Sequence, residues 1–148
     1  MVRKILLLVA LGMMVMSLIE CKKDDAPEPS VQEVQLAKLS GTWNCVDATK
    51  DGVARDTFGT FKLMITGTPG ANSVGYTCSG RPALSPWPAN GTLTFGTDPT
   101  MDLMRSDNLD MSYVVTDNAL EITFLYVGDG FPGRVRDIPG GWIFKFSK

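Results

Sequence analysis

An alternation of apolar and polar residues in short runs is the feature that most constrains the fold of this chain. Phe61, Leu63 and Ile65, for example, lie at every second position around the polar Lys62. Successive side chains of an extended strand point to opposite faces, so this period of two predicts half-buried β-strands. Clusters of Gly, Pro, Asn and Asp separate the runs and favour turns between them. The sequence therefore predicts a series of antiparallel strands from Gly41 to Phe146.

One apolar stripe is expected on each of eight or nine strands. The residues expected to face inward are Trp43, Cys45, Phe61, Leu63, Ile65, Tyr76, Cys78, Leu93, Phe95, Met101, Leu103, Leu109, Met111, Tyr113, Val115, Leu120, Ile122, Phe124, Tyr126, Trp142, Phe144 and Phe146. A further short strand is expected around residues 134–138, with tight turns at 106–108, 116–118 and 139–141. A single open sheet would expose its edges and its apolar face. We therefore expect an up-and-down barrel, with a β-sandwich as the alternative.

The N-terminus has the layout of a secretory signal, because Arg3 and Lys4 precede an uncharged, apolar segment that ends at Ile19. This segment is short for a permanent membrane span, which needs about 20 apolar residues. The run from Leu18 to Cys21 resembles the lipobox of bacterial lipoproteins, with Glu20 where that family has Gly, Ala or Ser. The resemblance implies that residues 1–20 are removed and that Cys21 is acylated. The alternative is a plain secreted protein with an incidental cysteine near its start.

The residues after Cys21 are similar to the start of many Bacteroidetes lipoproteins, in which a Lys followed by acidic residues resembles a signal for export to the outer face. That resemblance implies a lipid-anchored protein of the bacterial outer membrane, exposed on the cell surface, with the periplasmic face as the alternative. Residues 22–29 are charged and rich in Pro, so residues 21–30 are expected to form a lipidated, solvated tether. Ser30 and Glu33 fit a capping box for a short helix from about Val31 to Leu39. The folded domain would then comprise residues 31–148.

Charge and cysteine content limit the partners of this domain. Removal of residues 1–20 would take Arg3, Lys4 and Glu20 from 14 basic and 16 acidic residues, which leaves a formal charge of −3. A nucleic-acid partner is therefore not expected, because such binding relies on clustered Lys and Arg. Cys45 and Cys78 could form a disulfide or remain two buried thiols. No metal or other cofactor is expected, because the chain contains no histidine and zinc sites normally need four clustered ligands.

Three features together resemble the lipocalin-like, or calycin-like, barrels of Bacteroidetes surface lipoproteins: a short helix before Gly41-Thr42-Trp43, an up-and-down run of strands, and a terminal stretch from Gly141 to Phe146. A segment from Pro86 to Phe95 also resembles uncharacterised domains of that kind. In lipocalins the matching Trp packs at the closed end of the barrel under an Arg from a late strand. The resemblance thus implies such a role for Trp43, with Arg134 or Arg136 supplying the cation.

The long connection from Gly80 to Asn90 is the best candidate for a functional loop, because long loops over a barrel mouth often carry function. Trp87 lies between two prolines that would hold its ring at low entropic cost, so it is the first candidate for ligand contact. Tyr76 and Arg81 are the next candidates. The alternative is that Trp87 plugs one end of the barrel, because large aromatic side chains are usually buried.

Enzymatic activity is not expected. Without histidine, the most frequent general base and any Ser–His or Cys–His nucleophile are missing. Loop aspartates such as Asp107 are better explained as turn residues than as a hydrolytic acid pair. We therefore expect a non-enzymatic, membrane-anchored lipoprotein that binds a small apolar or carbohydrate-like ligand. The alternative is a structural lipoprotein with a solid barrel that docks onto an envelope assembly and so has a protein partner.

Overall fold

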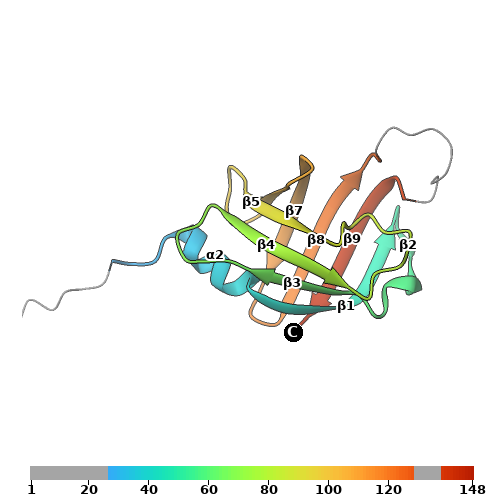
Figure 1. Cartoon of the computed structure of the whole chain (residues 1–148), viewed down its shortest axis with the longest axis horizontal. Helices are drawn as coiled ribbons and strands as arrows, with labels where there is room; N and C mark the ends of the chain where they lie inside the picture. Colours follow the sequence, from blue (N-terminus) through green and yellow to red (C-terminus); the bar gives the residue numbers. More distant parts are fainter. Residues whose placement is uncertain (1–26, 129–137) are drawn as a thin grey trace, which may run out of the picture.

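The computed structural model describes residues 27–128 and 138–148, in which antiparallel strands curve around a single core (Figure 1). The strands are β1 (Gly41–Lys50), β2 (Val53–Ala54), β3 (Lys62–Thr66), β4 (Ser73–Ser79), β5 (Asn90–Phe95), β6 (Asp102–Arg105), β7 (Leu109–Val115), β8 (Ala119–Tyr126) and β9 (Gly140–Ser147). One helix, α2 (Val31–Leu39), precedes them, and a 3₁₀ turn, η1 (Asp56–Phe58), follows β2.

Pairing between β1 and β9 closes the sheet into a barrel. From β3 to β9 each strand pairs with the next, and β1 pairs with both β3 and β9, so eight strands complete the circle. The ninth strand, β2, pairs only with the end of β1. A register shift between Cys45 and Asp47 marks a bulge, at which β1 leaves β3 and continues towards β2. The predicted all-β barrel is confirmed, and the sandwich alternative is wrong.

The predicted inward stripes are confirmed except at β6. Met101 was expected to face inward, but it is 49% exposed, whereas Leu103 and Arg105 are buried. The reason is local, because the amides of Met101 and Asp102 both donate to the carbonyl of Asp98 and hold residue 101 in a turn. The turn expected at 139–141 begins earlier, since β9 already starts at Gly140. The strand expected around 134–138 lies outside the described residues except for residue 138, which is in a bend.

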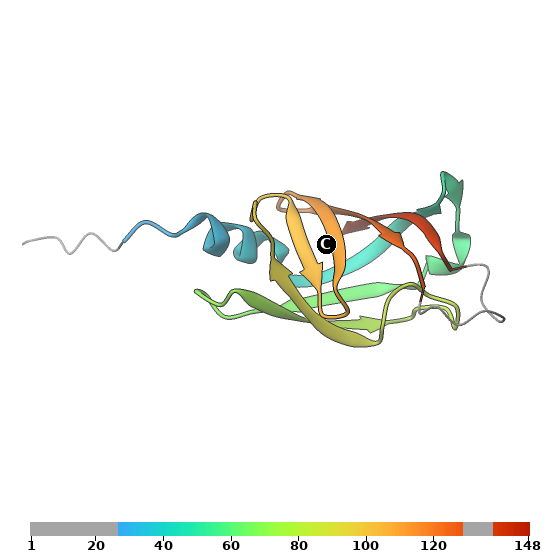
Figure 2. The ribbon, with the colours of Figure 1, turned by 90° about the horizontal axis from the view of Figure 1, so that it is seen from above.

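Helix α2 covers one end of the barrel, which we call the closed end (Figure 2). It begins and ends as predicted, because the Ser30 hydroxyl accepts a hydrogen bond from the Glu33 amide while the Glu33 carboxylate accepts one from the Ser30 amide. Leu36 and Leu39 are the helix residues buried in the core. We call the opposite end, where residues 51–59, 80–89 and 106–108 lie, the mouth. No helix in the described ranges is long and apolar enough to cross a membrane.

Aromatic side chains fill the barrel. The buried aromatic residues are Trp43, Phe58, Phe61, Tyr76, Trp87, Phe95, Tyr113, Phe124, Trp142, Phe144 and Phe146. Phe144 is central among them, and its ring lies 5.0 Å from that of Phe58 and 5.4 Å from that of Trp142, centroid to centroid. Such edge-to-face and offset pairs add to the burial of apolar area. The interior is therefore a packed core, as expected for a barrel of only eight strands.

Candidate functional site

The mouth carries a groove of about 500 Å³ between the β2–η1 segment and the loop that joins β4 to β5. Its lining residues are Ala54, Arg55, Asp56, Thr57, Phe58, Pro82, Ala83, Leu84 and Trp142. The lining is mainly apolar, and Leu84 is 52% exposed at its rim. The long loop that the sequence indicated thus forms one wall of a groove, with η1 as the opposite wall.

Buried aromatic rings form the base of this groove. Phe58 is brought there by η1 and meets Trp142 edge to face, with 5.5 Å between the ring centroids. The Trp142 indole also donates a hydrogen bond of 2.8 Å to the carbonyl of Ile138. Both side chains are nearly inaccessible, at 2% and 3% exposure. A ligand in the groove would therefore contact ring edges, the aliphatic side chains of the loop and the polar side chains of residues 55–57, because neither ring offers an open face.

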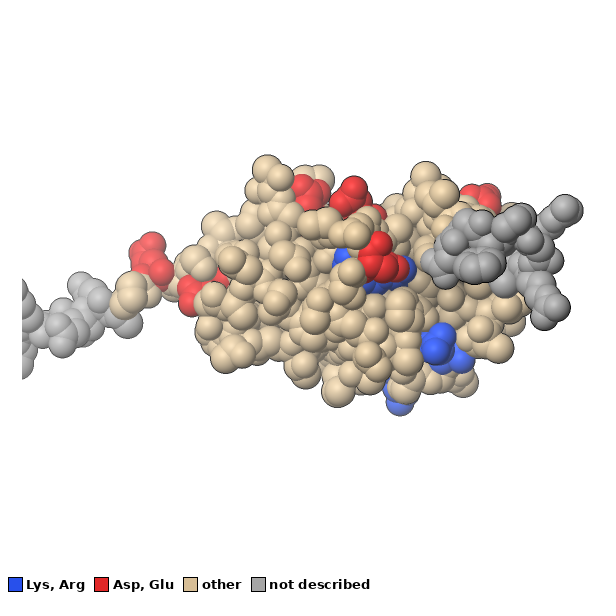
Figure 3. Space-filling view, turned by 45° about the horizontal axis from the view of Figure 1, so that its top comes forward, with Lys and Arg blue, Asp and Glu red and all other residues tan. Residues whose placement is uncertain are grey.

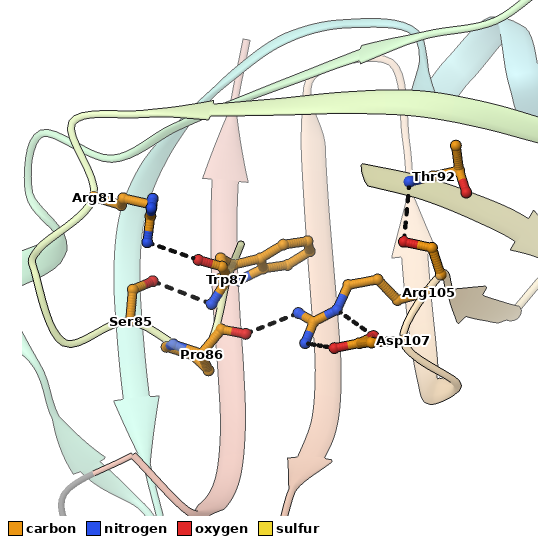
Figure 4. Close-up of polar contacts among 8 residues, drawn as sticks. Arg81, Ser85, Pro86, Trp87, Thr92, Arg105 and Asp107 are labelled. Atoms are coloured by element: carbon orange, nitrogen blue, oxygen red, sulfur yellow. Dashed lines mark hydrogen bonds and ion pairs between the residues drawn. The ribbon is translucent and has the colours of Figure 1, made fainter. Parts of the chain in front are cut away.

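Trp87 does not line the groove. It is fully buried inside the barrel, where its ring packs edge to face against Tyr76, Phe124 and Phe144. Figure 4 shows how the loop holds this ring: the Trp87 amide donates to the Ser85 hydroxyl at 3.1 Å, and Arg81 donates to the Trp87 carbonyl at 3.2 Å. Trp87 is therefore a residue of the packed barrel core, and its ring has no exposed surface for ligand contact.

Of the other predicted contact residues, Tyr76 lies beside Trp87 and Arg81 lies outside the core. The Tyr76 ring centroid is 5.6 Å from that of Trp87, and the side chain is 2% exposed. Burial raises the pKa of Tyr76 to about 12, so its hydroxyl remains a donor at neutral pH. Arg81 is exposed and holds the backbone of the loop. The structure thus brings Tyr76 and Trp87 together, while none of the three lines the groove.

Arg105 is the residue that sequence analysis missed. Its side chain is fully buried and forms a bidentate pair with Asp107, at 2.9 Å from Nε and 2.8 Å from Nη2 (Figure 4). The remaining terminal nitrogen, Nη1, donates to the carbonyl of Pro86 at 2.9 Å. The guanidinium also lies 5.4 Å from the centroid of the Trp87 ring, within cation–π range. One arginine therefore joins β6 to the loop that carries Trp87.

The sequence did contain a signal for Arg105. It follows Leu103 by two residues, so the alternation of β6 places it on the inward face. Asp107, two residues later, supplies the opposite charge that a buried arginine needs. In return, hydrogen bonds from Arg105 hold the pKa of the Asp107 carboxyl below its usual range. Asp107 is thus a structural partner of Arg105, which agrees with its interpretation as a turn residue.

A disulfide between Cys45 and Cys78 is not present. Both are free buried thiols, and the chain of β3 lies between their strands. The backbone amide of Cys45 donates to the Phe61 carbonyl on one side of this segment, and Cys78 pairs with Leu63 on the other. Two interstrand spacings amount to about 9.6 Å, beyond the roughly 7 Å limit between the Cα atoms of bonded cysteines. Burial raises the pKa of Cys45 to about 11 and that of Cys78 to about 12. Both are therefore poor nucleophiles.

At the closed end, Trp43 is fully buried and its indole nitrogen donates to the carbonyl of Leu39 at 2.7 Å. A cation does lie over its ring, but it is Lys148, whose Nζ is 4.5 Å from the ring centroid. The two arginines expected in this role, Arg134 and Arg136, lie outside the described residues. The C-terminal residue thus supplies a cation that the resemblance assigned to a late strand.

The described residues contain no group of three or more His, Cys, Asp or Glu side chains that could hold a metal ion. Basic side chains on the face shown in Figure 3 lie in separate spots and form no continuous stripe. No known protein family matches the sequence, and a search of curated proteins finds no significant similarity. Fold and local geometry are therefore the basis for any functional assignment.

Proposed function

We propose that this chain is an exported lipoprotein whose barrel binds a small apolar ligand in the groove at its mouth. The observation that carries the proposal is the groove itself, because its volume of about 500 Å³ exceeds the roughly 300 Å³ at which binding sites for drug-sized ligands begin. Small-molecule sites are concave and mostly apolar, with few polar groups, and this groove has that character. It also lies at the mouth of a barrel, where ligand sites often occur.

The lining favours an apolar ligand over a carbohydrate. Sugars are typically held by an exposed aromatic face and by several hydrogen bonds, yet Phe58 and Trp142 are almost fully buried. The apolar part of the accessible surface is supplied by small and aliphatic residues, with Leu84 the most exposed large one, and the polar part by Arg55, Asp56 and Thr57. A ligand that covers Leu84 and the neighbouring Pro82 would gain free energy mainly from the removal of apolar area from water.

The anchor is part of the same proposal. Acylation of Cys21 would hold the barrel at a membrane, because each buried CH₂ contributes about 0.8 kcal/mol and two or three chains are needed for durable attachment. The residues between Cys21 and helix α2 could reach about 30 Å when extended. The similarity of this region to the start of Bacteroidetes lipoproteins favours the cell surface of an outer membrane. The barrel would then bind its ligand close to that surface.

A structural role is the second candidate, and the filled interior of the barrel favours it. The outer surface also carries a groove of about 650 Å³ across β6, β7 and β8. Its lining includes Met104 and Leu125, which are 41% and 63% exposed. Exposed apolar patches of this kind often mark protein–protein contacts. In this alternative, the solid barrel would dock onto an envelope assembly through its outer face.

Binding of the uncharged dye N-phenyl-1-naphthylamine tests the two candidates. We expect Leu84→Asp to weaken dye binding about tenfold, because it places a charge on the apolar wall of the mouth groove. Leu125→Asp is the matched control, since it makes the same change on the outer groove. Loss of binding in the control alone would contradict the proposal. Recovery of one stoichiometric envelope protein, lost in Leu125→Asp, would favour the structural role instead.

Metabolic labelling with a fatty-acid analogue tests the anchor separately. The wild-type chain should incorporate label and remain with the membrane fraction, whereas Cys21→Ser should do neither. Equal label in the two chains would exclude acylation at this cysteine. Because Cys21 lies outside the barrel domain, the dye measurement is expected to be the same for both chains.

A further inference from the structure

Trp87 fills the interior of the barrel although it does not belong to a strand. It comes from the loop between β4 and β5, and its ring is surrounded by Phe61, which immediately precedes β3, and by the strand residues Tyr76, Phe124 and Phe144. The ends of this loop are tied to neighbouring segments, because the Thr60 hydroxyl donates to the Gly80 carbonyl and the Cys78 amide donates to the Ala89 carbonyl. Between these ends, a polar contact reaches from the loop to a strand, namely Arg105 to the carbonyl of Pro86, while the bond from Arg81 to the Trp87 carbonyl lies within the loop. Withdrawal of this one side chain would leave the strands paired and open an indole-sized space among the rings.

Two donors in this part of the core have no acceptor. The Tyr76 hydroxyl and the Trp87 indole nitrogen are both buried without a hydrogen-bond partner. A buried donor left unpaired costs about 1–3 kcal/mol, so the inserted position of Trp87 is less stable than its packing alone would make it. Such groups in a folded protein call for an explanation, and an acceptor supplied from outside the chain is one.

The position of the Tyr76 hydroxyl depends on a glycine in the neighbouring strand. It pairs with Gly91 on β5, and a Cβ at position 91 would lie only 2.7 Å from the Tyr76 hydroxyl. Glycine therefore allows the tyrosine ring to lie across the neighbouring strand, towards Arg105. Arg105 supplies a second donor there, because Nη1 would lose its acceptor if Pro86 moved with Trp87. The two donors come from different strands and do not depend on the loop.

We propose that the space filled by the Trp87 indole is a second binding site, which takes an uncharged planar aromatic molecule bearing a carbonyl oxygen when the loop withdraws Trp87. The surrounding rings would hold a flat aromatic ligand as they hold the indole. The carbonyl oxygen would accept from Tyr76 and Arg105. The ligand is uncharged because Asp107 already neutralises Arg105, so a carboxylate would place an uncompensated negative charge in the core. This site does not require the mouth groove to bind anything.

The full chain labelled with 5-fluorotryptophan allows the wild-type protein to be tested. Its three tryptophans give three ¹⁹F signals, and Trp87→Phe assigns the one of interest. Indole-3-carboxaldehyde is the probe, and we expect it to move the Trp87 signal most, towards the position of solvent-exposed tryptophan. Indole, which lacks the acceptor, and indole-3-carboxylate, which is charged, should each bind more weakly, by about fivefold or more.

A stability comparison of two tyrosines tests the unpaired hydroxyl. Tyr76→Phe should weaken binding of the carboxaldehyde by about fivefold while it raises, or leaves unchanged, the denaturation midpoint of the unliganded chain. Tyr113→Phe is the matched control, because the Tyr113 hydroxyl donates to the carbonyl of Pro99. The control should lower the midpoint and leave binding unchanged. A merely structural role of Tyr76 would give the two variants the same loss of stability.

Trp87→Ala completes the test, since it removes the side chain that competes with the ligand and should therefore bind the carboxaldehyde more tightly than wild type. The proposal is overturned if the probe fails to bind both wild type and Trp87→Ala at millimolar concentration. It is also overturned if the probe binds without moving the Trp87 signal. If the probe binds without moving the Trp87 signal and Leu84→Asp abolishes that binding, the probe lies in the mouth groove. This outcome distinguishes the two sites.

Discussion

Each end of the barrel contains a buried Trp and a buried Tyr, but their side-chain donors have acceptors at one end and none at the other. At the closed end, the Trp43 indole donates to Leu39 and the Tyr113 hydroxyl donates to Pro99. Near the mouth, Trp87 and Tyr76 are as deeply buried, but neither donor has a partner. A cation lies over the indole at each end, Lys148 over Trp43 and Arg105 over Trp87.

This contrast indicates that the ends serve different purposes. Trp43 is part of β1, and its acceptor is the last residue of α2, so the closed end joins strand and helix, and the Trp43 and Tyr113 donors both have acceptors. Trp87 is part of the loop between β4 and β5 and belongs to no strand pair. Regions with unsatisfied groups and few backbone hydrogen bonds are the ones that open at low free-energy cost. The closed end thus supports the barrel, and the mouth is suited to change.

The largest expected effect comes from exchanging the two tryptophans for alanine. Trp43→Ala should lower the free energy of unfolding by about 4 kcal/mol, because it leaves a cavity and an unpaired Leu39 carbonyl. Trp87→Ala should cost about 2 kcal/mol, because the loop can collapse and an unpaired donor is removed. Urea denaturation of both variants measures the difference. Equal losses would show that the two ends are held alike.

Removal of the Asp107 carboxylate should have the next largest effect. Asp107→Ala leaves the buried Arg105 without its counter-ion and should cost about 2 kcal/mol, a value limited by the 45% exposure of the Asp107 side chain. Denaturation at neutral pH measures this loss. It should be accompanied by greater protease cleavage within residues 80–89, since Arg105 also holds Pro86. Unchanged cleavage would show that the loop does not depend on this pair.

The same pair predicts a pH dependence. Since the pKa of Asp107 is lowered in the folded protein, the pair stabilises the fold fully above the unfolded carboxyl pKa of about 3.9, and this contribution is lost as the pH falls through the lower folded pKa. The difference in unfolding free energy between wild type and Asp107→Asn should therefore shrink in acid. A difference that stays constant down to pH 2 would exclude ionisation as its cause.

A smaller effect is expected at the start of α2. Ser30→Ala removes the hydroxyl that caps the Glu33 amide and should cost about 1 kcal/mol. Because the helix covers only the closed end, the loss should leave probe binding near the mouth unchanged. Parallel denaturation and ¹⁹F titrations would show this separation. A loss of probe affinity would mean that the ends are coupled.

The smallest effect is expected from Lys148→Met, which keeps much of the side-chain volume but removes the cation over Trp43. Exposed cation–π contacts contribute about 0.5–1 kcal/mol, and Lys148 also donates to the carbonyl of Lys38 at 2.9 Å. We expect the free energy of unfolding, measured by urea denaturation, to decrease by that amount. No change would show that Trp43 is held by packing and by its bond to Leu39 alone.

Much of the architecture followed from local patterns. The capping box placed helix α2 from Val31 to Leu39, as the structure has it. The alternation of apolar and polar residues predicted nearly all the inward-facing side chains, because a shift of one residue in any strand would expose its apolar face to water. Met101 was misplaced because a turn based on Asp98 interrupts the alternation there, and no pattern over so few residues distinguishes a turn from a strand start.

The candidate site was less predictable. The loop from Gly80 to Asn90 is a candidate functional loop by its length and composition, and residues 82–84 of it form one wall of the mouth groove. The sequence did not reveal whether Trp87 points into the barrel or across its mouth. That choice depends on Arg105, which meets the loop only after two further strands have been placed.

Local patterns were enough to predict the all-β class and nearly all the inward residues, because burial acts on residues two positions apart, and the capping box was enough to predict the helix. Which distant residues meet depends on the closed barrel. It separated Cys45 from Cys78 by placing β3 between them, it brought Lys148 over Trp43, and it seated Trp87 beneath Arg105. Contacts of this kind depend on how the sheet closes, so no periodicity within a single strand can predict them.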